Sequence, residues 1–247
     1  MSRPKKEVVL IGAGIMSATL GVLIKALMPD MRIKIFERLD RIGAESSDAW
    51  NNAGTGHSAF CELNYTPEYE DGTIDLSKAL RIAGQFEISK QLWTYLKEKG
   101  HLPQSEAFIN DIPHMSFVWG AENVSFLKKR HQQMTQYSIF KDMMYSSDLG
   151  QIAEWVPLMM KGRKSKYPFS ATRMELGTDV NFGAITRGMI KYLEGCDNVD
   201  LNLGYEVRGL HKLGKGEWQV DVKNLDNGDE TCFTSDYIFI GAGGGAI

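Results

Sequence analysis

The residues best suited to chemistry are the glycines that follow an apolar run near the start of the chain. Val8 to Ile11 are apolar and mostly β-branched, and Gly12, Ala13 and Gly14 come directly after them. Gly12 permits a tight turn out of a strand, and Gly14 lets the backbone approach a phosphate because it has no Cβ. The helix expected from Ile15 would present free N–H groups and a partial positive charge to an anion. This spacing predicts a site for the pyrophosphate of a dinucleotide.

The surrounding sequence supports this prediction at two positions. Ser17 replaces the third glycine of the usual pattern, and as a small residue it still allows close packing of the helix on the strand. Arg32 to Phe36 read as a second buried strand, and Glu37 follows them, twenty residues after Ser17. A carboxylate at that position is expected to hydrogen-bond the ribose hydroxyls, which favours NAD or FAD over NADP.

A secretory signal peptide is the alternative interpretation of the N-terminus. Lys5 and Lys6 precede the apolar run, as the basic residues of a signal peptide do. Glu7, Lys25 and the glycines interrupt that run, however, and no small-residue cleavage site follows. These interruptions favour the nucleotide site.

Composition limits the class of protein. The 247 residues are 43% hydrophobic and 24% charged, which fits one large α/β domain or two smaller ones with a normal core. The net charge of −3 argues against nucleic acid as the main partner. No run approaches the roughly 20 apolar residues of a membrane span. Cys61, Cys196 and Cys232 are too scattered for a disulfide framework or a metal site, so we expect no metal and a reducing cytoplasm.

Hydrophobic spacing predicts how the elements follow one another. A long helix begins after Asp75 and ends at Gly100, and a hairpin turns at Asn227-Gly228. Further strands are expected near residues 114–119, 171–176, 199–203, 205–210, 218–222, 232–234 and 237–241, and further helices at about 15–28, 121–137 and 182–193. The chain thus begins a nucleotide-binding sheet, leaves it for a long mixed segment, and returns to a second glycine turn. Two-domain flavoproteins make such an excursion, whereas domains that bind only NAD usually do not.

We therefore expect an α/β protein whose Rossmann-like FAD-binding domain carries an inserted, mixed α+β substrate domain. The predicted parts are residues 1–65 for the first part of the FAD-binding domain, 66–180 for the insertion and 181–247 for the return. The final apolar strand runs into a glycine turn with no helix after it. Because strands of a parallel sheet need cover on both faces, we expect a chain truncated at its C-terminus.

Longer motifs resemble the malate:quinone oxidoreductase family across the whole chain. They are Gly12-Ala-Gly-Ile-Met-Ser-Ala-Thr-Leu-Gly21, Asn51-Asn-Ala-Gly-Thr-Gly-His57, Cys61-Glu-Leu-Asn-Tyr-Thr-Pro67, Pro113-His-Met-Ser-Phe-Val-Trp119, Gly177-Thr-Asp-Val-Asn-Phe-Gly183 and Gly241-Ala-Gly-Gly-Gly-Ala246. The resemblance implies a flavoprotein, related to D-amino-acid oxidase, that holds FAD non-covalently. It also implies oxidation of (S)-malate to oxaloacetate in the tricarboxylic acid cycle, with electrons passed to a membrane quinone. Such enzymes are peripheral at the inner face of the cytoplasmic membrane.

The resemblance also implies roles for individual residues. Those expected to contact FAD are Gly12, Ala13, Gly14 and Ser17 at the pyrophosphate, Glu37 at the ribose, Asn52, Ala53, Gly54, Thr55 and Gly56 beside the flavin ring, Val207 at the adenine, and Gly241, Ala242 and Gly243 at a later turn.

Oxidation of a 2-hydroxy acid also needs a base for the hydroxyl proton and cations for the carboxylates. His57 is the candidate base because it ends the loop expected at the flavin, and imidazole accepts protons near neutral pH. Arg173 and His114 are the candidate malate-binding residues, since a guanidinium suits bidentate binding of a carboxylate. Each of the three also has a structural interpretation, as a hydrogen-bonding or ion-pairing side chain.

Three further alternatives stay open from the sequence. The basic run of residues 161–166 is either a solvated loop or a contact for anionic lipid. The enzyme could be a related FAD-dependent oxidase of another 2-hydroxy acid, such as 2-hydroxyglutarate. The chain could also be a non-catalytic fragment that binds FAD weakly or not at all.

Overall fold

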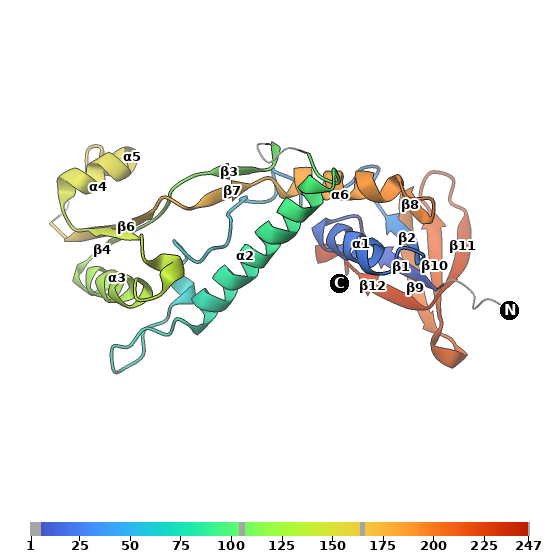
Figure 1. The fold of residues 1–247 in the computed structure, drawn as a ribbon, viewed down its shortest axis with the longest axis horizontal. Helices are drawn as coiled ribbons and strands as arrows, with labels where there is room; N and C mark the ends of the chain where they lie inside the picture. Colours follow the sequence, from blue (N-terminus) through green and yellow to red (C-terminus); the bar gives the residue numbers. More distant parts are fainter. Residues whose placement is uncertain (1–5, 104–106, 164–165, 247) are drawn as a thin grey trace. The chain divides into compact units, whose positions relative to one another are not determined.

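Two compact units make up the chain, and each is built from separate segments. The computed structural model describes residues 6–103, 107–163 and 166–246. The chain passes from one unit to the other after Gly54, Thr94, Phe108 and Val180, so that the second unit comprises residues 55–94 and 109–180. Figure 1 shows the elements of both units in the colours of the sequence.

The domain boundaries at 65/66 and 180/181 stay a prediction, and the compact units group two short segments as follows. Residues 55–65 join the second unit because Ala59 and Phe60 are buried in its hydrophobic core. Residues 95–108 join the first unit, where the Leu102 side chain lies against Gly188. Side-chain packing therefore decides to which compact unit each of these short segments belongs.

A four-stranded parallel sheet, with strand order β12-β1-β2-β8, is the centre of the first unit. Its strands are β1 (Glu7–Ile11), β2 (Arg32–Glu37), β8 (Val199–Leu203) and β12 (Tyr237–Ile240). Helices α1 (Ile15–Leu27) and α6 (Phe182–Glu194) pack closely together, because Gly21 leaves room for Leu193. Val9, Leu10 and Ile33 are fully buried, as expected for parallel strands with both faces covered.

An antiparallel sheet in the order β11-β10-β9 covers the other face of the parallel one. It consists of β9 (Tyr205–Lys212), β10 (Trp218–Asn224) and β11 (Glu230–Ser235). Val220 and Val222 pack with Val9 and Phe36 in one buried cluster. The predicted hairpin is confirmed: β10 and β11 pair around Asn227-Gly228, and Gly228 has a φ of +80°.

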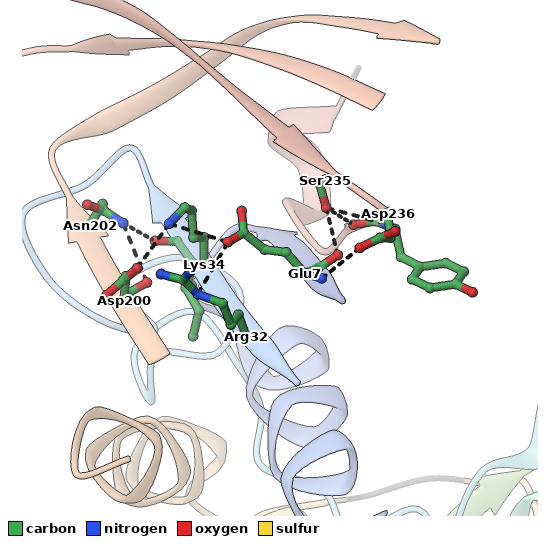
Figure 2. A network of polar contacts seen from close by, with 9 residues as sticks. Glu7, Arg32, Lys34, Asp200, Asn202, Ser235 and Asp236 are labelled. Carbon is green, nitrogen blue, oxygen red and sulfur yellow. Dashed lines mark hydrogen bonds and ion pairs between the residues drawn. The ribbon is translucent and has the colours of Figure 1, made fainter. Parts of the chain in front are cut away.

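Charged and polar side chains bind the amino ends of the parallel strands together (Figure 2). The Lys34 ammonium lies 3.0 Å from an Asp200 carboxylate oxygen and 3.6 Å from a Glu7 carboxylate oxygen. The Glu7 N–H donates to the Asp236 carboxylate at 2.8 Å, and the Ser235 hydroxyl donates to the Glu7 carbonyl at 3.1 Å. This network links β1, β2, β8 and the start of β12, and leaves the carboxyl ends of the strands free for other contacts.

The second unit contains an antiparallel sheet in the order β4-β6-β5 and a separate pair, β3 and β7. Its strands are β3 (Ile109–Asp111), β4 (His114–Trp119), β5 (Met144–Ser146), β6 (Phe169–Met174) and β7 (Thr178–Val180), and its helices are α2 (Ser77–Glu98, up to Thr94), α3 (Ala121–Met134), α4 (Leu149–Trp155) and α5 (Pro157–Met160). Met134 and Met174 belong to one buried cluster, and Ile152 and Ala171 to another. In Figure 1, α3 lies on one side of β4 and β6, and α4 and α5 lie on the other.

Short helical turns complete the described structure at residues 63–65, 138–140, 214–216 and 243–246. The long helix begins at Ser77, and Leu76 rather than the expected Asp75 takes the N-cap position, because the Leu76 carbonyl accepts from the Leu80 N–H. The Asp75 carboxylate lies one residue before this position and accepts from the Ser77 N–H at 2.9 Å. None of the helices in the described ranges has both the length and the apolar character that crossing a membrane requires.

Candidate functional site

A cavity lies at the carboxyl ends of β1 and β2, where open parallel sheets usually bind ligands. Five separate segments of the first unit form its wall. The lining residues are Ile11, Gly12, Gly14 and residues 36–39, 43–47, 205–207, 241–243 and 245. Seven of the predicted FAD contacts therefore meet around one cavity, although they come from both ends of the chain. They are Gly12, Gly14, Glu37, Val207, Gly241, Ala242 and Gly243.

Gly12 is required by the close approach of two turns. Its φ is +92°, and a Cβ there would lie 2.8 Å from the Gly241 carbonyl oxygen. The Gly12 N–H donates to the Phe36 carbonyl at 2.7 Å, and the Gly241 N–H donates to the Ile11 carbonyl at 2.8 Å. The turn after β1 and the turn after β12 are thus in direct contact.

Gly14 is the N-cap of α1, so no capping side chain covers the start of this helix. A Cβ there would make only ordinary contacts, 3.6 Å from the Ser47 hydroxyl and 3.8 Å from the Gly241 carbonyl. Protein packing therefore does not demand glycine at this position. The first turn of α1 carries no acidic residue, and the Ile15 N–H donates to the Ser47 hydroxyl at 3.1 Å. The partial positive charge of the helix end faces a cavity without a counter-charge from its own first turn.

Glu37 lies at the end of β2 with its carboxylate fixed beside the glycine turn. One oxygen accepts from the Ala13 N–H at 2.7 Å, and the other accepts from the Leu39 N–H at 2.9 Å. In this structure Ala13 is fully buried, and its N–H is engaged by Glu37. Each carboxylate oxygen keeps a second lone pair for a hydroxyl donor in the cavity.

Ser17 lies behind the cavity wall. Its side chain is fully buried, and a Cβ on Gly241 would come within 2.3 Å of its hydroxyl oxygen. That hydroxyl has no hydrogen-bond partner among the described residues. The structure therefore gives Ser17 a packing position between α1 and the second glycine turn.

Val207 reaches the cavity from β9, next to an irregularity in the strand. The pairing of β9 with β10 shifts by one residue, so that Gly209 faces Asp221 while Val207 faces Val222. The extra residue is Arg208, which forms an ion pair with Glu206. A bulge of this kind locally frees backbone groups from the ladder.

The predicted flavin loop is divided between the two units. Asn52 folds back on the first unit, where its side-chain amide donates to the Ser46 carbonyl at 3.0 Å and its oxygen accepts from the Gly54 N–H. Ala53 is exposed, and Thr55 forms a single bridge with Asp179 in the second unit. The Gly56 N–H donates to the Thr178 carbonyl at 2.9 Å. None of the loop's five residues lines the described cavity.

The predicted catalytic and substrate residues all lie in the second unit, in three different settings. His57 is 53% exposed, and its Nδ1 lies 3.4 Å from the Glu62 carboxylate. His114 is buried, its Nε2 donates to the Thr178 carbonyl at 3.1 Å, and its buried Nδ1 has no hydrogen-bond partner among the described residues. Arg173 forms an ion pair with Glu175, whose contact raises the pKa of the guanidinium and lowers the pKa of the carboxyl.

A buried arginine in the second unit was not among the predicted residues. Arg130 is fully buried, and it donates to the Thr66 hydroxyl at 2.9 Å and to the Ala59 and Phe60 carbonyls at 3.1 and 3.2 Å. Burial lowers its pKa to about 10, although the nearby Cys61 and Glu62 oppose this shift. Only its place on an otherwise apolar face of a helix could have drawn attention to it.

The cavity wall also includes residues that sequence reasoning missed. Ser47 accepts from the first turn of α1, and the Gly43 N–H donates to the Ala13 carbonyl at 3.2 Å. Gly43 has a φ of +61°, which favours glycine. Arg38 lines the same cavity directly after Glu37. The small and polar composition of residues 43–47 was the available signal. No cluster of three or more metal-ligating side chains occurs in the described part of the chain.

Comparison with known proteins identifies the family. A family model described as "Malate:quinone oxidoreductase (Mqo)" matches residues 4–247. The chain belongs to the malate:quinone oxidoreductase family. Its relative from Flavobacterium psychrophilum, named "Probable malate:quinone oxidoreductase", is 56% identical over 249 residues, which cover 100% of this chain and 50% of the relative. The chain spans about half the length of the curated relatives it matches.

Solved structures share the α/β fold of this malate:quinone oxidoreductase family member. Glycine oxidase from Geobacillus kaustophilus has a TM-score of 0.66 at 14% identity, and the match covers 96% of this chain and 55% of the oxidase. L-α-glycerophosphate oxidase from Mycoplasma pneumoniae, solved with FAD bound, has a TM-score of 0.60 at 15% identity, and the match covers 96% of this chain and 53% of the oxidase. The predicted fold class is confirmed.

Proposed function

We propose that this chain binds FAD in the cavity at the ends of β1 and β2, as part of an enzyme that oxidises (S)-malate and reduces a quinone. One observation carries the proposal: a single cavity is lined by the uncapped start of α1, the Glu37 carboxylate and the Gly241 turn. The family assignment supplies the reaction, which belongs to the tricarboxylic acid cycle. The solved oxidase with FAD bound supports the choice of cofactor through its shared fold.

The residues of the cavity fit the adenosine diphosphate part of FAD. Gly14 would let the phosphates approach the end of α1, since none of the described residues fills the space of its missing side chain. Glu37 would accept hydrogen bonds from the ribose hydroxyls with its free lone pairs. Val207 would hold the adenine from β9, and the Gly241–Gly243 turn would contact the cofactor from the neighbouring strand. Bound FAD supplies the acceptor for the hydride of the substrate.

The chain's own residues would bind and deprotonate malate in the second unit. Arg173 would hold a substrate carboxylate by exchanging its ion pair with Glu175. His114 would add a hydrogen-bonding partner at Nδ1, which has no partner among the described residues. His57, more than half exposed and oriented by Glu62, would accept the hydroxyl proton, and the Asn52–Gly56 loop that precedes it would lie beside the flavin. These roles are part of the proposal.

The proposed location rests on the quinone and on the family resemblance. A quinone acceptor resides in a membrane, and the resemblance implies a peripheral protein on the inner face of the cytoplasmic membrane.

Flavin loading tests the cofactor site directly. Purified chain mixed with FAD should retain flavin absorbance after gel filtration, and Glu37→Gln should weaken binding by about tenfold or more, since hydrogen bonds to a charged group contribute about 1.5–3 kcal/mol. Asp200→Asn, in the network at the opposite end of the sheet, is the matched control and should bind as the parent does. A colourless protein would favour the non-catalytic fragment.

Reduction of the bound flavin tests the reaction. In the full-length enzyme, anaerobic addition of (S)-malate should bleach the flavin absorbance, and a quinone should restore it. Bleaching by 2-hydroxyglutarate instead, with peroxide released in air, would favour the related oxidase.

A further inference from the structure

Three large apolar side chains are exposed on α5 and among the described residues that come after it. Leu158 is 88% exposed, Met159 43% and Tyr167 67%. Lys161 and Lys166 are exposed between them in the sequence. These five residues are called the α5 surface below.

Leu158 and Met159 are exposed because the packed side of α5 carries other residues. Val156 and Met160, one helical turn apart, pack against the cluster that contains Phe169. Leu158 lies between these two anchors in the sequence and therefore on the outward side of the turn.

Arg163 fixes the end of α5. Its Nε donates to the Met159 carbonyl at 3.0 Å. Its guanidinium lies 5.3 Å from the ring centre of Phe117 and 5.5 Å from that of Phe169, within the range of cation–π attraction. Leu158 and Met159 are therefore presented by an anchored backbone.

The charge of this region is opposite to that of the whole chain. Residues 156–169 contain Lys161, Arg163 and Lys166 among those described, and no aspartate or glutamate. The chain as a whole has a net charge of −3. Exposed apolar side chains flanked by lysines are the combination that binds anionic lipid surfaces.

We propose that the α5 surface docks on an anionic lipid bilayer. Leu158 and Met159 enter the boundary between headgroups and acyl chains, and Lys161 and Lys166 contact the lipid phosphates. A stable protein interface uses about 20–30 residues on each side, which is far more than this projecting turn offers. The inference rests on the proposed function only in that a quinone-reducing enzyme must reach a membrane.

Vesicle sedimentation tests the docking surface without flavin or substrate. The purified chain should sediment with vesicles of phosphatidylcholine and phosphatidylglycerol at 3:1 and stay in solution with phosphatidylcholine alone. The double variant Lys161→Gln/Lys166→Gln should bind the anionic vesicles about 25-fold more weakly, at about fivefold for each lysine. Leu158→Ser should weaken binding at least fivefold, since burial of a leucine side chain is lost.

Matched controls lie elsewhere on the molecule. Lys128→Gln removes an exposed lysine of α3, and Leu27→Ser removes a leucine of α1 that is 77% exposed, so both should bind vesicles as the parent does. Circular dichroism identifies any variant that has unfolded. Equal binding by all variants, or no binding to anionic vesicles, would overturn the proposal. FAD absorbance of the same samples reports separately on the cofactor site, so a failure of one proposal is distinguishable from a failure of the other.

Discussion

Two glycines of the same turn have different reasons to be glycine. At Gly12 the backbone has positive φ, and the Gly241 carbonyl occupies the space of a side chain. At Gly14 the protein leaves that space open. The first glycine therefore serves the fold, and the second is available to serve a ligand.

Substitution of Gly12 should damage the first unit. We expect Gly12→Ala to lower the free energy of unfolding by about 2–4 kcal/mol, because it combines an unfavourable backbone conformation with a clash against Gly241. Gly84→Ala, in the interior of α2, is the control. Outside the backbone of that helix, no atom of the described residues lies within 4 Å of where its Cβ would be, so alanine should raise stability by about 0.5–1 kcal/mol. Urea denaturation measures both, and a loss of stability in the control alone would contradict this account.

Cys61 is a second residue whose surroundings define its chemistry. Burial raises the pKa of its thiol to about 11, and the charge and hydrogen bond of Glu62 add to this shift while Arg130 opposes it. The thiolate, which is the reactive form, is therefore rare in the folded protein at neutral pH.

Alkylation rates should distinguish the cysteines. At pH 8 we expect iodoacetamide to modify the exposed Cys232 at least roughly tenfold faster than Cys61. Because the folded pKa of Cys61 exceeds the unfolded value of 9.0, its contribution to stability is complete below pH 9 and is lost as pH rises through about 11. Mass spectrometry measures the rates, and comparison with Cys61→Ser across that pH range measures the stability. Equal alkylation of both thiols would contradict the prediction.

At the scale of elements, α6 shows how a single side chain begins a helix. The Asn181 side-chain oxygen accepts from the Ala184 N–H at 2.9 Å, just where the chain enters the first unit. Ile185, Met189 and Leu193 then fall on one buried face of the helix.

Loss of this cap should weaken the first unit moderately. Asn181→Ala should lower the free energy of unfolding by about 1 kcal/mol, whereas Asn181→Asp should keep most of the stability because it retains the acceptor. Thermal denaturation followed by circular dichroism measures both. If the aspartate variant were as unstable as the alanine variant, the hydrogen bond would not be the source of the effect.

Elements with strong local signals could be predicted from the sequence. The β1–α1–β2 unit, α2, β4 and the β10–β11 hairpin each carry apolar spacing, a cap or a turn dipeptide within one short segment. Strand β5 was missed because Met144–Ser146 has three residues and pairs only with β6, whose sequence lies far along the chain. Such strands are defined by tertiary packing and have no local pattern.

The same distinction applies to the candidate site. Gly12, Gly14 and Glu37 could be placed in the cavity because a fixed spacing encodes them, and Gly241 because it repeats the strand–glycine pattern. The positions of Ser47 and Arg38 in the cavity wall depend on how the chain after β2 folds back, and no fixed sequence spacing encodes that fold. The relation of Arg130 to Ala59 and Phe60 joins segments about seventy residues apart and needed coordinates.

At the scale of the whole molecule, the first unit depends on its last strand. β12 is an edge strand that pairs in parallel with β1, and the Gly241 turn follows it. All elements of the second unit lie before Asn181.

Removal of residues 236–247 should therefore affect the two units unequally. We expect amide hydrogens in β1 and β2 to exchange faster by at least roughly tenfold, because one neighbour of β1 is lost, while those of β4 and β6 keep their protection. Hydrogen exchange with mass spectrometry measures both units in one sample. Equal loss of protection in β4 and β6 would show that the second unit cannot fold without the first.

The pairing of β1 with β12 has a consequence for synthesis on the ribosome. The opening strand emerges first and its neighbour β2 soon follows, yet its other neighbour, β12, is translated more than two hundred residues later. At about 5–20 residues per second, the edge of β1 that pairs with β12 stays without that partner for on the order of ten seconds or longer. During that interval a chaperone that shields Val8–Ile11 would have its greatest effect, and slow codons before Tyr237 would lengthen the period of risk.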